Sequence, residues 1–78
     1  MSNGQKLRII IITFKSSHDA IASQDILTNR NLEFKVIPTP SELSSECGIS
    51  LEIKAHSQLE CMEALSEHSI RFACYPIS

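Results

Sequence analysis

The chain has 78 residues, of which 42% are hydrophobic and 21% charged, with a formal net charge of -2. This length predicts one small domain, with residues 1–5 as a flexible polar tail and residues 6–78 as the folded part. Acidic and basic residues are scattered without a basic stripe, which argues against nucleic acid and against a membrane surface as partners. The longest apolar run, Ile9 to Ile12, is far too short to span a membrane.

Cysteine and histidine positions narrow the chemistry further. Three cysteines without paired spacing favour reduced thiols over a disulfide framework, and no signal-peptide pattern is seen, so we expect a cytoplasmic protein. His56, Cys61 and His68 match no zinc-ligand spacing, and no metal is expected. Cys61 and Cys74 are interpreted as buried structural residues. Without a phosphate loop, a Ser-His-Asp set or paired carboxylates, no cofactor is expected and no conventional hydrolase or nucleotide chemistry is supported.

The first half of the chain predicts a strand, a helix and a second strand. Residues 7–14 are apolar on both alternating faces, as in a central strand. Ser16, followed three residues later by Asp19, predicts the start of a helix over residues 17–29. The side chains that this helix would bury are Ala20, Ile21 and Leu27. Asn31 is the expected left-handed helix end, and alternation over 32–36 predicts a half-buried strand.

The second half predicts a strand, a helix and a final strand. Alternating residues 49–53 indicate a strand, and a capping box at Ser57 opens a helix that ends near residue 67. The side chains expected on its inner side are Leu59, Met62 and Leu65. The last strand is expected over residues 70–75, ended by Pro76. The order βαββαβ predicts an α+β ferredoxin-like fold, a four-stranded antiparallel sheet with two helices on one face.

The one long non-periodic segment runs from Pro38 to Gly48. Pro38 and Pro40 exclude a central strand or helix interior through it. Thr39 is expected to cap one helical turn over residues 40–46, and Gly48 is expected to end that turn in the left-handed conformation. A long loop at a rigid corner is a common place for function on a small scaffold.

Topology indicates why Cys47, in this loop, deserves interest. A right-handed crossover makes the first two strands parallel, so the loop lies at the same sheet edge as the turn after the first strand. Lys15, Ser17 and His18 occupy that turn and the helix start, and Arg71 emerges at the same edge. A helix N-terminus and nearby cations favour the thiolate, the reactive form of cysteine. We therefore expect Cys47 to be an activated, accessible nucleophile.

The same features have simpler interpretations. A loop cysteine is often a passive small residue, the proline-rich loop can be only a rigid connector, and His18 can be merely solvated. Apolar residues would also lie on the sheet face that the helices leave uncovered, namely Ile10, Ile12 and either Ala73 or Tyr75. Such a surface predicts a homodimer or a docking surface for a partner.

Two blocks, residues 12–20 and residues 37–49, resemble the selenium/sulfur carrier-like family of small bacterial proteins. The first reads ITFKSSHDA, and the second contains IPTP followed by SSECGI. The resemblance covers about residues 8–77. It implies a carrier rather than a complete enzyme, whose motif cysteine, here Cys47, holds sulfur or selenium as a persulfide or selenopersulfide. Its partners would be a donor, such as a cysteine desulfurase or selenocysteine lyase, and an acceptor enzyme.

In such a carrier, the anion at Cys47 would be stabilised by Lys15, His18 and the amides of Ser17 and His18. Gly48 would let the sulfur face outward. The family usually has a basic residue where this chain has Ser41 and a small residue where it has Glu46, and both changes should raise the thiol pKa. An alternative from another class is a non-catalytic ferredoxin-like interaction or regulatory module with an incidental cysteine. A thiol redox sensor is a third possibility.

Overall fold

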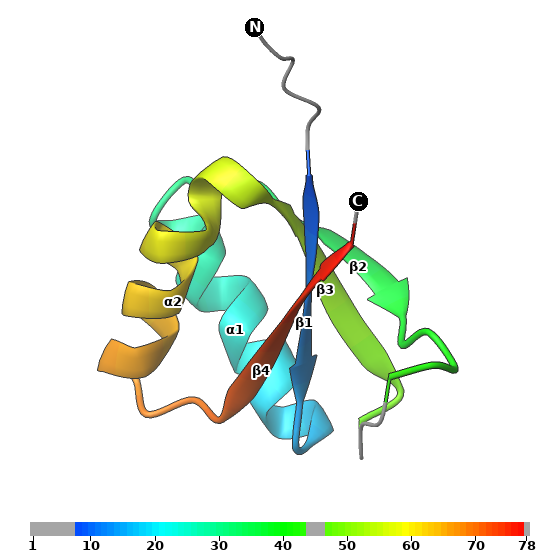
Figure 1. Cartoon of the computed structure of the whole chain (residues 1–78). Coiled ribbons are helices and arrows are strands. Elements are labelled where there is room, and N and C mark those ends of the chain that lie inside the picture. The colour runs from blue at the N-terminus through cyan, green and yellow to red at the C-terminus, as the bar shows by residue number, and fades with distance from the viewer. Residues whose placement is uncertain (1–7, 44–46, 78) are drawn as a thin grey trace, which may run out of the picture.

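The computed structural model describes residues 8–43 and 47–77, and the order of its elements is βαββαβ with a short 3₁₀ helix before the second α-helix (Figure 1). The elements are β1 (Ile9–Phe14), α1 (Ser17–Asn29), β2 (Lys35–Pro38), β3 (Ile49–Lys54), η1 (Ala55–Ser57), α2 (Gln58–Glu67) and β4 (Phe72–Ile77). The predicted tail at residues 1–5 lies outside the described residues.

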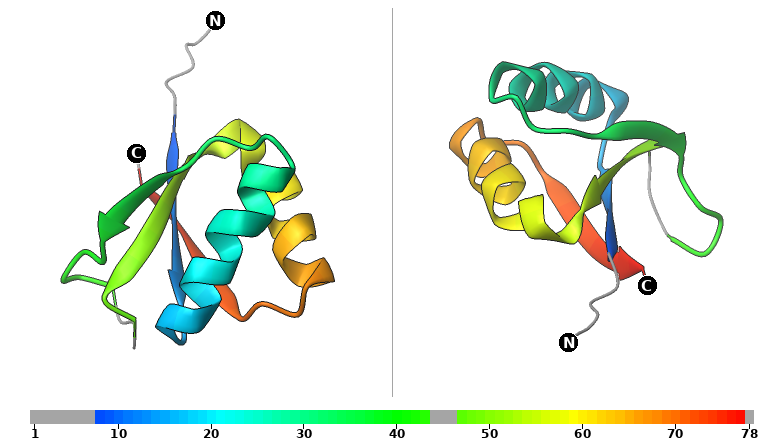
Figure 2. Two further views of the ribbon diagram at one scale, coloured as in Figure 1. Left: turned by 180° about the vertical axis from the view of Figure 1, so that it is seen from behind. Right: turned by 90° about the horizontal axis from the view of Figure 1, so that it is seen from above.

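The four strands form one antiparallel sheet in the order β2-β3-β1-β4. Both helices cover the same face of this sheet, and no helix in the described part of the chain covers the other face, which we call the open face (Figure 2). This face is not fully exposed, since Ile11, Thr13 and Ser50, which lie on it, are buried. The α+β ferredoxin-like fold class predicted from the sequence is confirmed.

The register decides which residues face the helices. Ile10 pairs with Ile53 and Ile12 with Leu51, and all four are buried in one cluster with residues of α1 and α2. Paired residues share a face of the sheet. The expectation that Ile10 and Ile12 lie on the open face is therefore wrong. The open face carries the alternate residues of the same strands, which include Ile11, Thr13, Ser50, Ala73 and Tyr75.

Each helix packs a narrower strip of its surface against the sheet than the hydrophobic pattern predicts. The buried residues of α1 are Ala20, Ser23 and Leu27, and those of α2 are Cys61, Ala64 and Leu65. Small side chains accompany Leu27 and Leu65 in these sets, and the spacing of three and four residues follows one helical face. Ile21 and Leu59 lie outside these stripes and are 57% and 77% exposed, so their predicted burial is wrong.

Helix ends agree with the sequence in α1 but not in α2. The Ser16 hydroxyl accepts a hydrogen bond from the Asp19 amide at 3.2 Å, and Asn31 has a φ of 59°, both as predicted. Ser57 makes no capping bond, because η1 precedes α2 and Ser57 is already in a helical conformation. Ser69 also has a positive φ, of 58°, after α2, which the sequence did not indicate.

The two edge strands extend over prolines that were expected to exclude or end them. β2 runs from Lys35 to Pro38, later than the predicted 32–36, and β4 continues through Pro76 to Ile77. Proline is tolerated at a sheet edge because its missing N–H would face no neighbouring strand. The position of β2 and β4 at the edges therefore explains both differences.

Candidate functional site

Four strand ends meet at one end of the sheet, which we call the Cys47 end. β1 and β2 finish there and β3 and β4 begin there, because β1 and β2 are both antiparallel to β3. The first turn of α1 lies at the same end, at the foot of Figure 1. Cys47 lies two residues before Ile49, the first residue of β3. The predicted convergence of loop, helix start and last strand is confirmed.

Cys47 itself lies in the core. It is only 3% exposed, and it belongs to the buried cluster that includes Phe14 and Ala20. Ile49 packs against the same cluster, as expected for two residues on one face of a strand. The prediction that the Cys47 sulfur is accessible is therefore wrong. The physical reason is that a buried cysteine packs as a small, polarizable apolar side chain.

Gly48 does not have the conformation expected of it. It has no positive φ, so it neither ends a left-handed turn nor aims the sulfur outward. It is exposed, and a Cβ added there would meet no atom within 4 Å.

Thr39, which directly follows β2, forms hydrogen bonds with the backbone around Cys47. Its amide donates to the Gly48 carbonyl at 3.1 Å, and its hydroxyl donates to the Cys47 carbonyl at 3.1 Å. The same hydroxyl lies 2.7 Å from the Ser50 hydroxyl, and the Ser50 side chain is fully buried. Thr39 therefore bridges across the base of the loop.

This arrangement replaces the expected helix cap at Thr39. The Leu43 amide donates to the Pro40 carbonyl at 3.0 Å, which makes a single turn over residues 40–43. Residues 44–46 of the predicted helical turn lie outside the described residues. The sequence did hold a signal for the observed role, since Thr39 continues the alternation of Ile37 and so falls on the face shared by Ser50.

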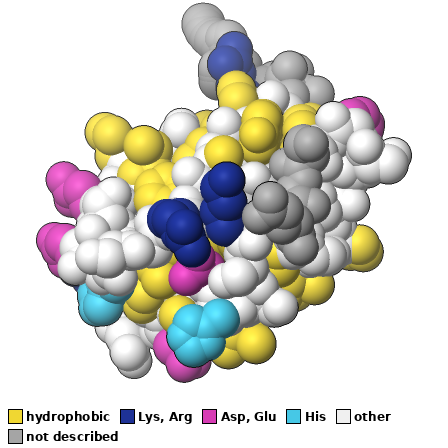
Figure 3. Space-filling model, turned by 90° about the horizontal axis from the view of Figure 1, so that it is seen from below, with side chains coloured by type: hydrophobic (Ala, Val, Ile, Leu, Met, Phe, Trp, Pro, Cys, Tyr) yellow, Lys and Arg dark blue, Asp and Glu magenta, His cyan; other side chains and the backbone are white. Residues whose placement is uncertain are grey.

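Two cations lie at the Cys47 end. The last pair of the β1–β4 ladder is Phe14 with Phe72, so Lys15 and Arg71 are the next residues beyond this pair. Both are exposed, and neither forms an ion pair with another described residue. Figure 3, which views the molecule from this side, shows Lys or Arg side chains side by side near its middle. This end of the sheet therefore carries two basic side chains that form no ion pair with a described residue.

The first turn of α1 adds backbone donors but also an acid. Ser16 accepts hydrogen bonds from the amides of Asp19 and Ala20, and so leaves the amides of Ser17 and His18 for other acceptors. The Ser17 and His18 side chains are exposed. One carboxylate oxygen of Asp19, Oδ2, is buried and has no hydrogen-bond partner among the described residues. Its negative charge offsets part of the positive potential of the helix start.

The two remaining cysteines lie away from this end and are poor nucleophiles. Burial, with smaller effects from Glu60 and Cys74, raises the pKa of Cys61 to about 11. Burial also raises the pKa of Cys74, partly opposed by a hydrogen bond from the Gln58 side chain. Both thiols therefore stay protonated near neutral pH, and the protonated form does not attack.

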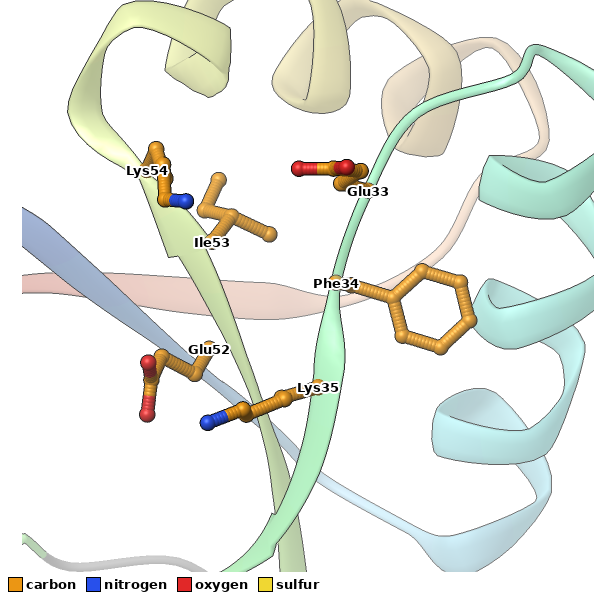
Figure 4. A pocket seen from close by; sticks show the side chains of 6 residues that line it. All are labelled: Glu33, Phe34, Lys35, Glu52, Ile53 and Lys54. Carbon is orange, nitrogen blue, oxygen red and sulfur yellow. The ribbon is translucent and has the colours of Figure 1, made fainter.

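A shallow pocket of about 340 Å³ lies at the opposite end of the sheet, where β2 begins and β3 ends (Figure 4). Its lining residues are Glu33, Phe34, Lys35, Glu52, Ile53 and Lys54. Acidic and basic side chains are equally represented, and no cysteine or histidine contributes. The pocket thus shares no residue with the Cys47 end.

Two further features concern metals and membranes. Within residues 8–43 and 47–77, no group of three or more histidine, cysteine or acidic residues could hold a metal ion. No helix in this part of the chain is both long and apolar enough to cross a membrane.

Comparison with known proteins identifies a family. A family model described as "Putative Se/S carrier protein-like" matches residues 10–75. The chain belongs to this family. The match covers the end of the sheet described above, with Lys15, Pro38, Pro40, Cys47 and Gly48. No curated protein and no solved structure matches the chain.

Proposed function

We propose that the protein carries sulfur or selenium on Cys47 as a persulfide or selenopersulfide, between a donor and an acceptor enzyme. The observation that carries this proposal is the convergence of Cys47, the Lys15–Arg71 pair and the start of α1 at one end of the sheet. Family membership adds the class of cargo. The raised pKa values of Cys61 and Cys74 argue against these two thiols as the carrier.

The proposed chemistry is thiolate exchange. The Cys47 thiolate attacks the outer sulfur of a donor persulfide, a new S–S bond forms at Cys47, and the donor cysteine leaves as a thiolate. With selenium, the corresponding S–Se bond forms. The bound persulfide is anionic, and Lys15, Arg71 and the free amides of Ser17 and His18 would compensate its charge. Loading requires that the buried sulfur first become exposed.

Reduced thiols are needed at every step, so we place the carrier in the cytoplasm, where thiol systems keep cysteines reduced. The donor would be a cysteine desulfurase or a selenocysteine lyase. We also propose self-association through the open face of the sheet, which is argued in the Discussion.

A second candidate is a non-catalytic interaction module in which Cys47 is only a core residue. The burial of Cys47 at 3% exposure favours this alternative, because a sulfur held in the core cannot meet a donor. The two candidates differ in one observable property, covalent loading of Cys47.

The test is intact-protein mass spectrometry after incubation of reduced protein with a cysteine desulfurase and cysteine, or with a selenocysteine lyase and selenocysteine. We expect the parent to gain one sulfur or selenium atom, removable by dithiothreitol, and Cys47→Ser to gain none. Cys74→Ala is the matched control and should load like the parent. Equal gain by Cys47→Ser, or no gain by the parent, would favour the interaction module.

A further inference from the structure

Thr39 forms hydrogen bonds with two backbone carbonyls and one side-chain hydroxyl around Cys47. Its amide and hydroxyl hold the carbonyls of Gly48 and Cys47, and the hydroxyl also contacts Ser50. Since Ser50 belongs to β3 and Thr39 directly follows β2, these contacts tie the backbone at Cys47 to two adjacent strands. We refer to these three hydrogen bonds as the Thr39 contacts.

The direction of the Cys47 side chain depends on these contacts. Along an extended chain, successive side chains point to opposite faces, so the backbone at Cys47 must stay in register with β3 for its sulfur to remain on the helix face. The hydroxyl of Thr39 holds the Cys47 carbonyl in that position. Removing the Thr39 hydroxyl would also leave the buried Ser50 hydroxyl without this partner. This loss costs free energy only in the arrangement in which Cys47 is buried.

We infer that Thr39 is a positioning residue that sets how often the Cys47 sulfur leaves the core and becomes reactive. The inference rests on the proposed function for its biological meaning, but the exposure of Cys47 can be measured without any donor enzyme. Thr39 acts through the Cys47 backbone, because its hydroxyl donates to the Cys47 carbonyl.

The experiment compares alkylation rates of the individual cysteines by iodoacetamide, read by peptide mass spectrometry, in the folded parent and in three variants. Thr39→Val keeps the shape but removes the hydroxyl, Thr39→Ser keeps the hydroxyl, and Thr28→Val makes the same change at an exposed helical position. We expect Thr39→Val to raise the Cys47 rate about tenfold, the effect of losing roughly one net hydrogen bond. In Thr39→Ser and Thr28→Val, Cys47 should be alkylated at the parent rate.

The other cysteines separate positioning from general destabilisation. If Thr39→Val merely loosened the whole fold, Cys61 and Cys74 would gain reactivity in the same proportion as Cys47. A rise at Cys47 alone, restored by Thr39→Ser, supports the inference, whereas an unchanged Cys47 rate or a uniform rise overturns it.

Loading by the desulfurase, measured in the same variants, is a separate result. If the parent does not load but Thr39→Val shows the selective rise, the carrier proposal fails and the positioning role stands. If the parent loads and the selective rise is absent, the positioning role fails and the carrier proposal stands.

Discussion

Cys61 gives the clearest pH dependence of any single residue described. In the folded protein its pKa is raised from 9.0 to about 11, mainly by burial. Between these values the folded state keeps a proton that the unfolded state loses, so the free energy of unfolding falls as pH rises from 9 toward 11. Below pH 9 the full contribution is present. The loss should reach about 1–3 kcal/mol.

Urea denaturation at about pH 8 and about pH 10.5 measures this loss. Cys61→Ala, which has no thiol to ionise, should be less stable at both values but should lose less stability between them. An equal loss in parent and variant would show that another group, such as Cys74, causes the alkaline destabilisation.

At the scale of residues, the sequence predicted which segments meet at the Cys47 end better than it predicted the burial of Cys47. Cys47, Lys15 and Arg71 could be placed at one end because topology alone brings them there. The burial of Cys47 was missed because the strand was expected to begin at Ile49, whereas the alternation of Ile49, Leu51 and Ile53 extends back to Cys47. The role of Thr39 was missed for a related reason, because a local capping pattern and a cross-strand contact use the same hydroxyl.

Among the elements, α1 depends on its first turn. Ser16 accepts the Asp19 amide at 3.2 Å, and an acid in that turn also interacts favourably with the helix dipole. Ser16→Ala should therefore lower the free energy of unfolding by about 1 kcal/mol. Urea denaturation measures this change in the free energy of unfolding. Ser66→Ala, at an exposed position inside α2, is the control. If Ser16→Ala lowered the free energy of unfolding no more than Ser66→Ala does, the capping bond would add no stability.

Central elements were predicted more accurately than edge elements, for a physical reason. β1, α1 and β3 have long hydrophobic or capping patterns that tertiary contacts reinforce. β2 and β4 are paired on one side only, so their limits depend on neighbouring strands rather than on their own residues. Pro38 and Pro76 illustrate this, since each pairs with a residue of the adjacent strand despite lacking a donor.

For the whole molecule, the order βαββαβ and the right-handed crossover were sufficient to predict the sheet and its Cys47 end. They were not sufficient to decide which face of β1 the helices cover. That choice depends on packing, because β1 is apolar on both faces, and Ile10, Ile11 and Ile12 are all at most 5% exposed.

The open face of the sheet is where we expect the protein to associate with itself. It carries Ala73 and Tyr75 on β4, and Lys35 paired with Glu52 on the opposite edge. Two copies related by a two-fold axis could place the lysine of one against the acid of the other. Three strands of six residues and one of four give a face of roughly 20 by 20 Å, well below the ~800 Å² that a stable interface buries on each partner. The dimer should therefore be weak.

Sedimentation velocity from micromolar to millimolar protein tests this expectation. The parent should shift from monomer toward dimer as concentration rises, and Ala73→Glu should remain monomeric because it places a charge on the exposed part of the open face. Leu59→Glu adds the same charge on the exposed side of α2, at a side chain that is 77% exposed, and should associate like the parent. A parent that stays monomeric throughout would rule out self-association. Association lost in Leu59→Glu but kept in Ala73→Glu would move the interface to the helices.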